Sequence, residues 1–144
     1  MKKKLIITTI ILVLLTLLVL FFPITKTHKL NGQAEILSPK KEVIGNCDLK
    51  IEITEFSSLV FNHKNTFSLK LNGKPIEFKS SSSDTESGDF WSITQSYYDE
   101  IRNWMDFCTL VYKKDFSYMV LSFEDNYYFL NNGSDVTYAQ LPIP

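Results

Sequence analysis

The chain begins with a long uncharged run that follows three lysines. After the lysines at positions 2–4, Leu, Ile, Val and Phe fill nearly every place up to residue 24. A helix needs about 20 apolar residues to cross a hydrocarbon core about 30 Å thick, and residues 5–24 supply that length. The pattern predicts a transmembrane helix over residues 5–24, with the lipid bilayer as its partner.

A cleaved secretory signal is the main alternative for this run. Such signals have apolar regions of about 7–15 residues and small residues before the cleavage site, whereas this run is longer and ends in Phe-Phe-Pro-Ile-Thr-Lys. We therefore expect an uncleaved signal-anchor. Because lysines tend to stay on the cytoplasmic side, we expect a single-pass protein with a cytoplasmic tail (residues 1–4) and an extracytoplasmic C-terminal domain.

Alternation of apolar and polar residues, typical of half-buried strands, dominates the rest of the chain. We expect a juxtamembrane linker over residues 25–33 and one folded domain over residues 34–144. The alternation is strict over residues 50–55, and Asn72-Gly73 between two alternating runs is a strong hairpin signal. Residues 80–89 carry no apolar side chain to bury and predict a loop. The other predicted strands cover residues 58–62, 66–71, 76–79, 107–112, 116–123, 127–130 and 136–141.

One segment has its apolar side chains at helical spacing instead. They fall at positions i, i+4, i+7, i+8 and i+11: Tyr97, Ile101, Trp104, Met105 and Cys108. Such a stripe is typical of an amphipathic helix, and Ser96 with Asp99 resembles a capping box at its start. We predict a helix from Ser96 to about Asp106. The predicted fold class is therefore α+β: a transmembrane helix, then a small antiparallel β-rich domain with one amphipathic helix packed on the sheet.

The charge of the domain argues against some partners. The chain has 15 Lys and Arg against 16 Asp and Glu, but beyond residue 30 only ten basic residues face all sixteen acids. Arg102 is the sole arginine. A negative domain without an arginine cluster is poorly suited to bind phosphate groups. We expect no nucleic acid and no anionic lipid surface as its main partner.

Two cysteines fall in the part of the chain predicted to be exported. An even cysteine count in an oxidising compartment favours a disulfide, so we predict a bridge between Cys47 and Cys108. Closing a loop of roughly 60 residues would stabilise the domain by about 4 kcal/mol. Two buried free thiols are the alternative, because cysteine is often a small buried apolar residue.

Aromatic residues crowd into the second half of the domain. Fourteen of the twenty lie between Phe90 and Tyr138, including all seven tyrosines and both tryptophans. They can pair across strands to cover a thin sheet, or they can form a recognition surface, since tyrosine gives large, rigid, amphipathic contacts. Neighbours on a strand point to opposite faces, so one residue of Tyr127-Tyr128 should be exposed. The candidate partner-binding residues are Tyr97, Tyr98, Tyr127 and Tyr128.

The sequence contains no constellation that indicates catalysis. It has no glycine-rich phosphate loop, Gly-x-Ser-x-Gly elbow or His-Glu-x-x-His motif, and neither His28 nor His63 is spaced with a second metal ligand. We expect a non-catalytic protein-binding module with no metal and no cofactor. An inhibitor or immunity-type protein that blocks a basic enzyme or toxin is a narrower version.

A different class also remains open: an envelope carbohydrate-binding domain or a small hydrolase. It predicts a concave pocket that is lined by Tyr or Trp and holds convergent carboxylates. The candidates for those carboxylates are Asp99, Glu100 and Asp106.

Overall fold

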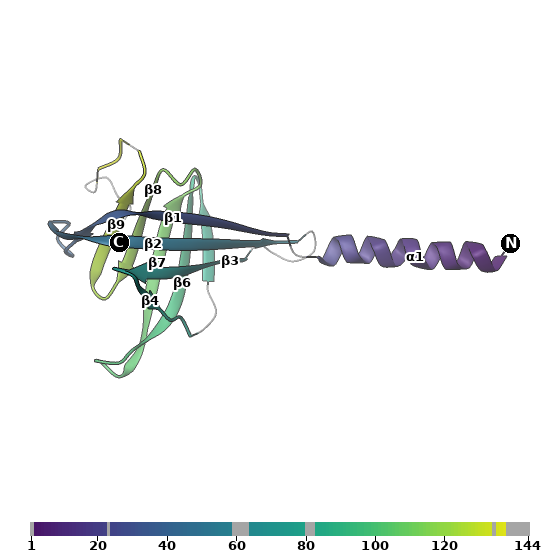
Figure 1. Cartoon of the computed structure of the whole chain (residues 1–144), viewed down its shortest axis with the longest axis horizontal. Helices are drawn as coiled ribbons and strands as arrows, with labels where there is room; N and C mark the ends of the chain where they lie inside the picture. Colours follow the sequence, from purple (N-terminus) through teal and green to yellow (C-terminus); the bar gives the residue numbers. More distant parts are fainter. Residues whose placement is uncertain (1, 23, 59–63, 80–82, 134, 138–144) are drawn as a thin grey trace.

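The computed structural model describes residues 2–22, 24–58, 64–79, 83–133 and 135–137. Within them the chain forms one N-terminal helix and a single antiparallel sheet of nine strands, in the order β4-β3-β2-β1-β9-β8-β7-β6-β5 (Figure 1). The helix extends away from the domain at one end of its long axis. The prediction of a β-rich antiparallel domain is confirmed.

Helix α1 (Lys2–Phe21) is long and apolar enough to cross a membrane. Its 20 residues span about 30 Å at 1.5 Å per residue, and its apolar side chains are exposed. The hydroxyls of Thr8, Thr9 and Thr16 each donate a hydrogen bond to the carbonyl four residues earlier, at 2.8–2.9 Å. The threonines therefore bring no unpaired donor into the apolar surface of the helix.

The expected linker over residues 25–33 is instead part of a long strand. Strand β1 (Ile24–Leu37) pairs with β2 (Val43–Ser57) along its whole length, from Ile24 opposite Ser57 onward. The inward side chains of β1 include Leu30, Ala34 and Ile36, and this alternation continues a strand pattern that His and Lys residues obscure. The helix therefore leads almost directly into the sheet.

The strands form two meanders. The first comprises β1, β2, β3 (Lys64–Leu71) and β4 (Lys74–Ile76). Asn72 and Gly73 connect β3 to β4 with φ angles of 47° and 80°, which confirms the predicted hairpin turn. The second meander comprises β5 (Ser83–Ser87), β6 (Phe90–Asp99), β7 (Trp104–Lys113), β8 (Tyr118–Phe123) and β9 (Asn126–Asn131).

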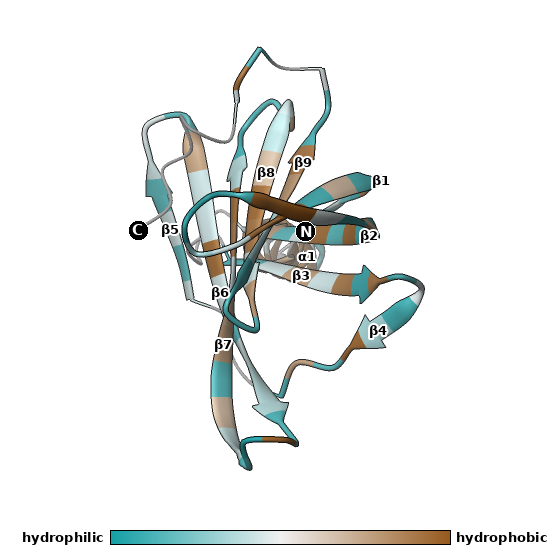
Figure 2. Ribbon diagram, turned by 90° about the vertical axis from the view of Figure 1, so that its left-hand side faces the viewer, coloured by the Kyte–Doolittle hydropathy of each residue, from teal (hydrophilic) through white to brown (hydrophobic). Residues whose placement is uncertain are grey.

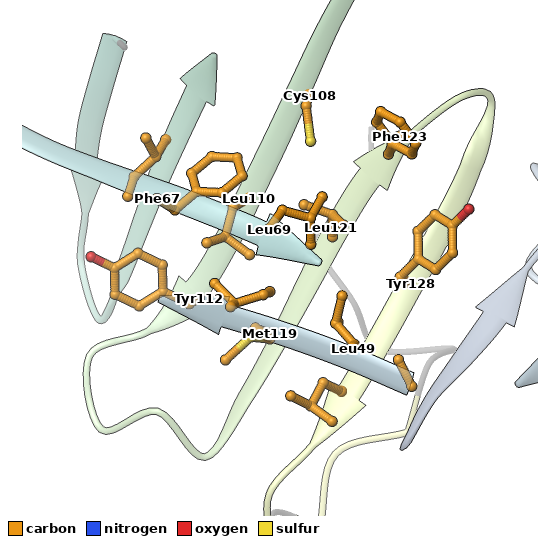
Figure 3. Packing of buried hydrophobic residues seen from close by; sticks show 14 of the residues in the cluster. Leu49, Phe67, Leu69, Cys108, Leu110, Tyr112, Met119, Leu121, Phe123 and Tyr128 are labelled. Carbon is orange, nitrogen blue, oxygen red and sulfur yellow. The ribbon is translucent and has the colours of Figure 1, made fainter. Parts of the chain in front are cut away.

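The two meanders share one short ladder and one core. Strand β9 joins β1 through three residue pairs, from Glu35 opposite Phe129 to Leu37 opposite Tyr127. The sheet then curls, so that β1–β3 run across β6–β9 (Figure 1). Leu49 and Leu69 from the first meander face Leu110, Met119 and Leu121 from the second (Figure 3). Burial of these apolar side chains holds the two layers together.

Polar contacts close the gap between the far edges of the curled sheet. The buried Gln95 side chain on β6 donates from Nε2 to the carbonyl of Phe67 on β3, at 2.6 Å. The backbone N–H of Asn65 donates to the Asp84 carboxylate at 3.0 Å, and the N–H of Lys79 donates to the Ser96 carbonyl at 3.0 Å. These bonds tie β3 and the segment after β4 to β5 and β6.

The predicted helix from Ser96 to Asp106 is wrong. These residues form the end of the β6–β7 hairpin, with Ser96 opposite Phe107 and Asp99 opposite Trp104. An isolated helix of this length is marginal in water, whereas extended pairing continues the ladder that starts at Phe90. Extended pairing also places Tyr97 against Phe123, with ring centroids 4.8 Å apart.

The predicted disulfide is also not formed, because Cys47 and Cys108 are both free and buried. Cys47 lies on β2 and Cys108 on β7, in opposite layers of the same core. Burial raises the pKa of both thiols, strongly for Cys108, with Asp48 adding to the shift at Cys47. Both cysteines therefore act as small buried apolar residues, which was the alternative interpretation.

Three smaller expectations have different outcomes. The predicted loop over residues 80–89 includes strand β5, which pairs with β6 from Ser83 opposite Thr94 onward. The predicted strands over residues 58–62 and 136–141 fall mostly outside the described residues. The predicted strand over residues 76–79 shares only residue 76 with β4, and the other predicted strands correspond to β2, β3, β7, β8 and β9.

We expect Gln95→Met to lower the free energy of unfolding by about 1–3 kcal/mol, because it leaves the buried Phe67 carbonyl without its donor. Chemical unfolding of the full chain in uncharged detergent micelles measures the change. The matched control is Gln33→Met, an exposed site whose loss should stay within about 0.5 kcal/mol. Equal losses in both variants would show that Gln95 does not close the sheet.

Candidate binding surface

The end of the β6–β7 hairpin projects beyond the strands on either side of it. Strand β5 pairs with β6 only up to Thr94, and β8 pairs with β7 only from Thr109 onward. Residues 95–99 and 104–108 thus pair mainly with each other, with one isolated bridge from Tyr97 to Phe78 on the outer side of β6. This ribbon extends below the rest of the domain (Figure 2). It lies on the side of the domain away from α1 (Figure 1).

This hairpin end carries apolar side chains that the core does not use. Ile101 is 95% exposed, Phe107 64% and Trp104 56%. Tyr98 lies opposite Met105, and directly opposed residues share one face of a sheet. With Phe107 two residues further along β7, Tyr98 and Met105 form an apolar face. Trp104 lies opposite Asp99 and points to the other face at the end of the hairpin, and Ile101 lies in the turn between them. We call the following five residues the hairpin surface: Tyr98, Ile101, Trp104, Met105 and Phe107.

The turn at the tip is held by its own polar groups. The Asp99 carboxylate accepts hydrogen bonds from the backbone N–H groups of Ile101 and Arg102, at 2.9 and 3.0 Å. Asn103 has a φ of 57°, a conformation that asparagine adopts more readily than most residues. The Tyr98 hydroxyl bonds to the Asn103 side chain. The exposed position of Ile101 follows from this fixed turn.

The opposite face of the hairpin carries a cluster of carboxylates around one guanidinium. Arg102 lies 3.6 Å from Asp99 and 3.5 Å from Asp106, and it also pairs with Asp125 on the turn between β8 and β9. Arg102 therefore links two turns that are 23 residues apart in the sequence. The pair with Asp125 is exposed to solvent and contributes little stability alone, whereas the Asp99 side chain is only 9% exposed.

Glu124 is the member of this cluster with the least favourable environment. Burial, followed by repulsion from Asp99, raises the pKa of its carboxyl; Asp106 and Asp125 act in the same direction and Arg102 opposes them. Glu124 and Asp125 also have positive φ angles, 49° and 61°. Such a turn is usually built from Asn and Gly, so the two acidic residues stand at a strained position.

A groove of about 420 Å³ lies between the hairpin and the segment that follows β4. Its polar groups come from Glu77, Lys79, Asp99, Glu100 and Glu124, and its apolar wall from Pro75, Ile76, Tyr97, Tyr98, Ile101 and Phe123. The Lys79 ammonium lies 5.1 Å from the centre of the Tyr98 ring, a cation–π distance. The groove thus connects the apolar and acidic faces of the hairpin end.

The four tyrosines predicted to bind a partner divide into two pairs. Tyr97 and Tyr128 are buried in the main core, and burial raises the pKa of both phenols. Tyr98 is exposed, and Tyr127 is half-buried against a second apolar cluster on the other face of the sheet. Tyr127 and Tyr128 do point to opposite faces, as the alternation predicts.

The structure brings only Tyr98 of these four onto the hairpin surface. Ile101, Trp104 and Met105 fall in the stripe that predicts a helix, and Phe107 begins the predicted strand over residues 107–112. The alternation of Met105, Asp106 and Phe107 is a weak strand signal in this segment, because Trp104 and Cys108 on either side are also apolar.

The carboxylates proposed for a hydrolase do not form a free pair. Asp99 and Asp106 both contact Arg102, and Asp99 also accepts two backbone N–H groups. Glu100 lies in the groove beside Asp99. Among the described residues, no three His, Cys, Asp or Glu side chains are grouped so that they could hold a metal ion.

Neither family models, curated proteins nor solved structures gave a match to this chain. The hairpin surface, the carboxylate cluster and the groove therefore carry the functional argument.

We expect Glu124→Gln to increase stability at neutral pH. Because the pKa of Glu124 is raised in the folded protein, the ionised carboxyl lowers the free energy of unfolding. This destabilisation is absent below the unfolded-state pKa of about 4.3 and develops as the pH rises through the folded-state pKa. The gain from the substitution should therefore be present at pH 7 and disappear near pH 3. Unfolding curves of both proteins across this range measure it; a gain that does not depend on pH would contradict the assignment.

Proposed function

We propose that this chain is a membrane-anchored, non-catalytic protein-binding module that contacts its partner through the hairpin surface. Helix α1 serves as a single-pass anchor, with the lysines at positions 2–4 in the cytoplasm and the sheet domain outside. The observation that carries the proposal is the exposure of Ile101, Trp104 and Phe107 on a projecting hairpin.

Exposed apolar side chains gathered at the end of one hairpin support a binding role. A single exposed apolar residue is normal on a protein surface, but a grouped patch indicates an interaction site. Tryptophan and tyrosine are among the residues that contribute most to protein interfaces, and the hairpin surface contains Trp104 and Tyr98. Since the core is complete without these side chains, folding alone does not account for them.

The position of the surface fits a tethered binding module. Two residues separate the end of α1 at Phe21 from the start of β1 at Ile24, so the anchor and the sheet are closely joined. The hairpin end lies on the side of the domain away from α1 (Figure 1). With the anchor in a bilayer, the domain would present this surface to the surrounding space and not to its own membrane.

The groove favours a second candidate function, carbohydrate binding. Saccharides bind where aromatic rings and hydrogen-bonding carboxylates converge, and the groove contains Tyr98, Glu100 and Glu124. Saturable binding of neutral oligosaccharides to the full chain, lost in Tyr98→Ala and kept in Phe107→Ser, would favour this candidate over the protein-binding module.

Photo-crosslinking tests the protein-binding proposal. With p-benzoylphenylalanine in place of Phe107, the full chain in its native membrane should form a discrete protein adduct. Adding Tyr98→Ser, which removes an aromatic from the same face as position 107, should reduce the adduct by about tenfold, because the loss of an interface aromatic costs more than about 1 kcal/mol.

The control places the same crosslinker at Phe56, an exposed aromatic near the C-terminal end of β2. No discrete adduct is expected there. Equal adducts from both positions, or none from position 107, would contradict the proposal.

A further inference from the structure

The hairpin end carries a large surplus of negative charge. Six carboxylates line the groove or surround Arg102: Glu77, Asp99, Glu100, Asp106, Glu124 and Asp125. Among the described residues of this same region, the cations are Lys79 and Arg102. Tyr98 lines the groove together with Glu100 and Glu124, and Phe107 borders a second hollow together with Glu124 and Asp125. A partner seated at this end therefore meets the apolar and the acidic side chains together.

The strained turn indicates that these carboxylates are not incidental. Glu124 and Asp125 occupy two successive positive-φ positions, where Asn-Gly would fit without strain. At the comparable turn between β3 and β4, the chain does use Asn72-Gly73. Strained residues persist where the side chain has a function. The β8–β9 turn thus keeps two acids beside the hairpin at a cost to its backbone.

The surplus of negative charge determines which classes of partner this surface can bind. Nucleic acids and anionic lipids carry negative charge and would be repelled. A second copy of the chain would bring the same carboxylates into the interface, and like charges placed together oppose association. A positively charged polypeptide with apolar side chains complements both the acidic and the apolar features.

We propose that the hairpin end binds a basic, amphipathic polypeptide segment of its partner. Apolar side chains of that segment pack on Tyr98, Met105 and Phe107. Its Lys or Arg side chains lie against the carboxylates of Glu100, Glu124 and Asp125, which Arg102 and Lys79 neutralise only in part. The inference rests on the proposed function and specifies the chemistry of the partner.

The two kinds of contact respond differently to salt. Exposed charges are screened over about 10 Å at 0.1 M salt and over about 3 Å at 1 M salt, whereas apolar burial does not weaken with added salt. The acidic contribution should therefore fade as salt is added, and the apolar contribution should remain.

Defined peptides test this inference on the full chain in uncharged dodecyl maltoside micelles. The probe is the capped heptapeptide Lys-Leu-Lys-Leu-Lys-Leu-Lys. One control peptide has Glu in place of each Lys, and another has Ser in place of each Leu. Calorimetric titration, corrected for protein-free micelles, gives the affinities, and circular dichroism checks that each variant remains folded.

We expect saturable binding of the Lys/Leu peptide alone. The double variant Glu124→Gln/Asp125→Asn should weaken it about fivefold at low salt and little at 0.5 M salt. Phe107→Ser should weaken it about tenfold at either salt concentration. The charge-matched control, Glu52→Gln/Glu86→Gln, removes two acids outside this surface and should leave the affinity unchanged.

Three results would overturn the inference. The first is equal binding of the Glu/Leu peptide. It would show that the surface binds apolar side chains without selecting basic ones, and the proposed protein-binding function would still stand. The second is no saturable binding of the Lys/Leu peptide, in which case the crosslinking experiment alone judges the proposed function. The third is quenching of Trp104 fluorescence by brominated phosphatidylcholine in vesicles, which would make the hairpin end a lipid-inserting element.

Discussion

The whole structure depends on one constraint: two meanders must bury a common apolar core although, among the described residues, β1 and β9 share a ladder of three residue pairs and one isolated bridge joins Phe78 to Tyr97. Burial of apolar side chains therefore holds the two meanders together in place of extensive strand pairing. It also fixes the register of each strand. A slip of one residue in β7 would turn Leu110 and Tyr112 out of the core. Because that register is fixed and β7 is longer than β8, the start of β7 extends beyond the end of β8.

The binding surface is thus a consequence of how the core is closed. Residues 104–107 have no strand partner on the β8 side among the described residues, and their apolar side chains stay largely in solvent. The β8–β9 turn ends beside them and contributes Asp125 to Arg102. If the hairpin surface binds a partner, the sheet serves as a rigid frame that keeps an apolar face and an acidic cluster together, while β1 connects the frame closely to the anchor.

Part of this could be predicted from the sequence. The apolar helix, the Asn72-Gly73 turn and most strands follow from local pattern. The β6–β7 hairpin does not, because Tyr97, Ile101 and Trp104 match helical spacing although only Tyr97 enters the core. Periodicity assumes that apolar residues are buried, and it fails where they serve a surface. The free cysteines also remove one argument for export, so the orientation proposed for the anchor rests on the N-terminal lysines.

Backbone NMR of the full chain in uncharged micelles tests the central claim most directly, namely that residues 90–113 form a hairpin with a solvent-exposed apolar end. The account predicts β-type secondary chemical shifts through Tyr98 and again from Trp104 to Cys108, with strong relaxation of Ile101 and Phe107 by a soluble paramagnetic agent. Helical shifts across residues 96–106, or protection of Ile101 and Phe107 from the agent in the unliganded protein, would contradict it.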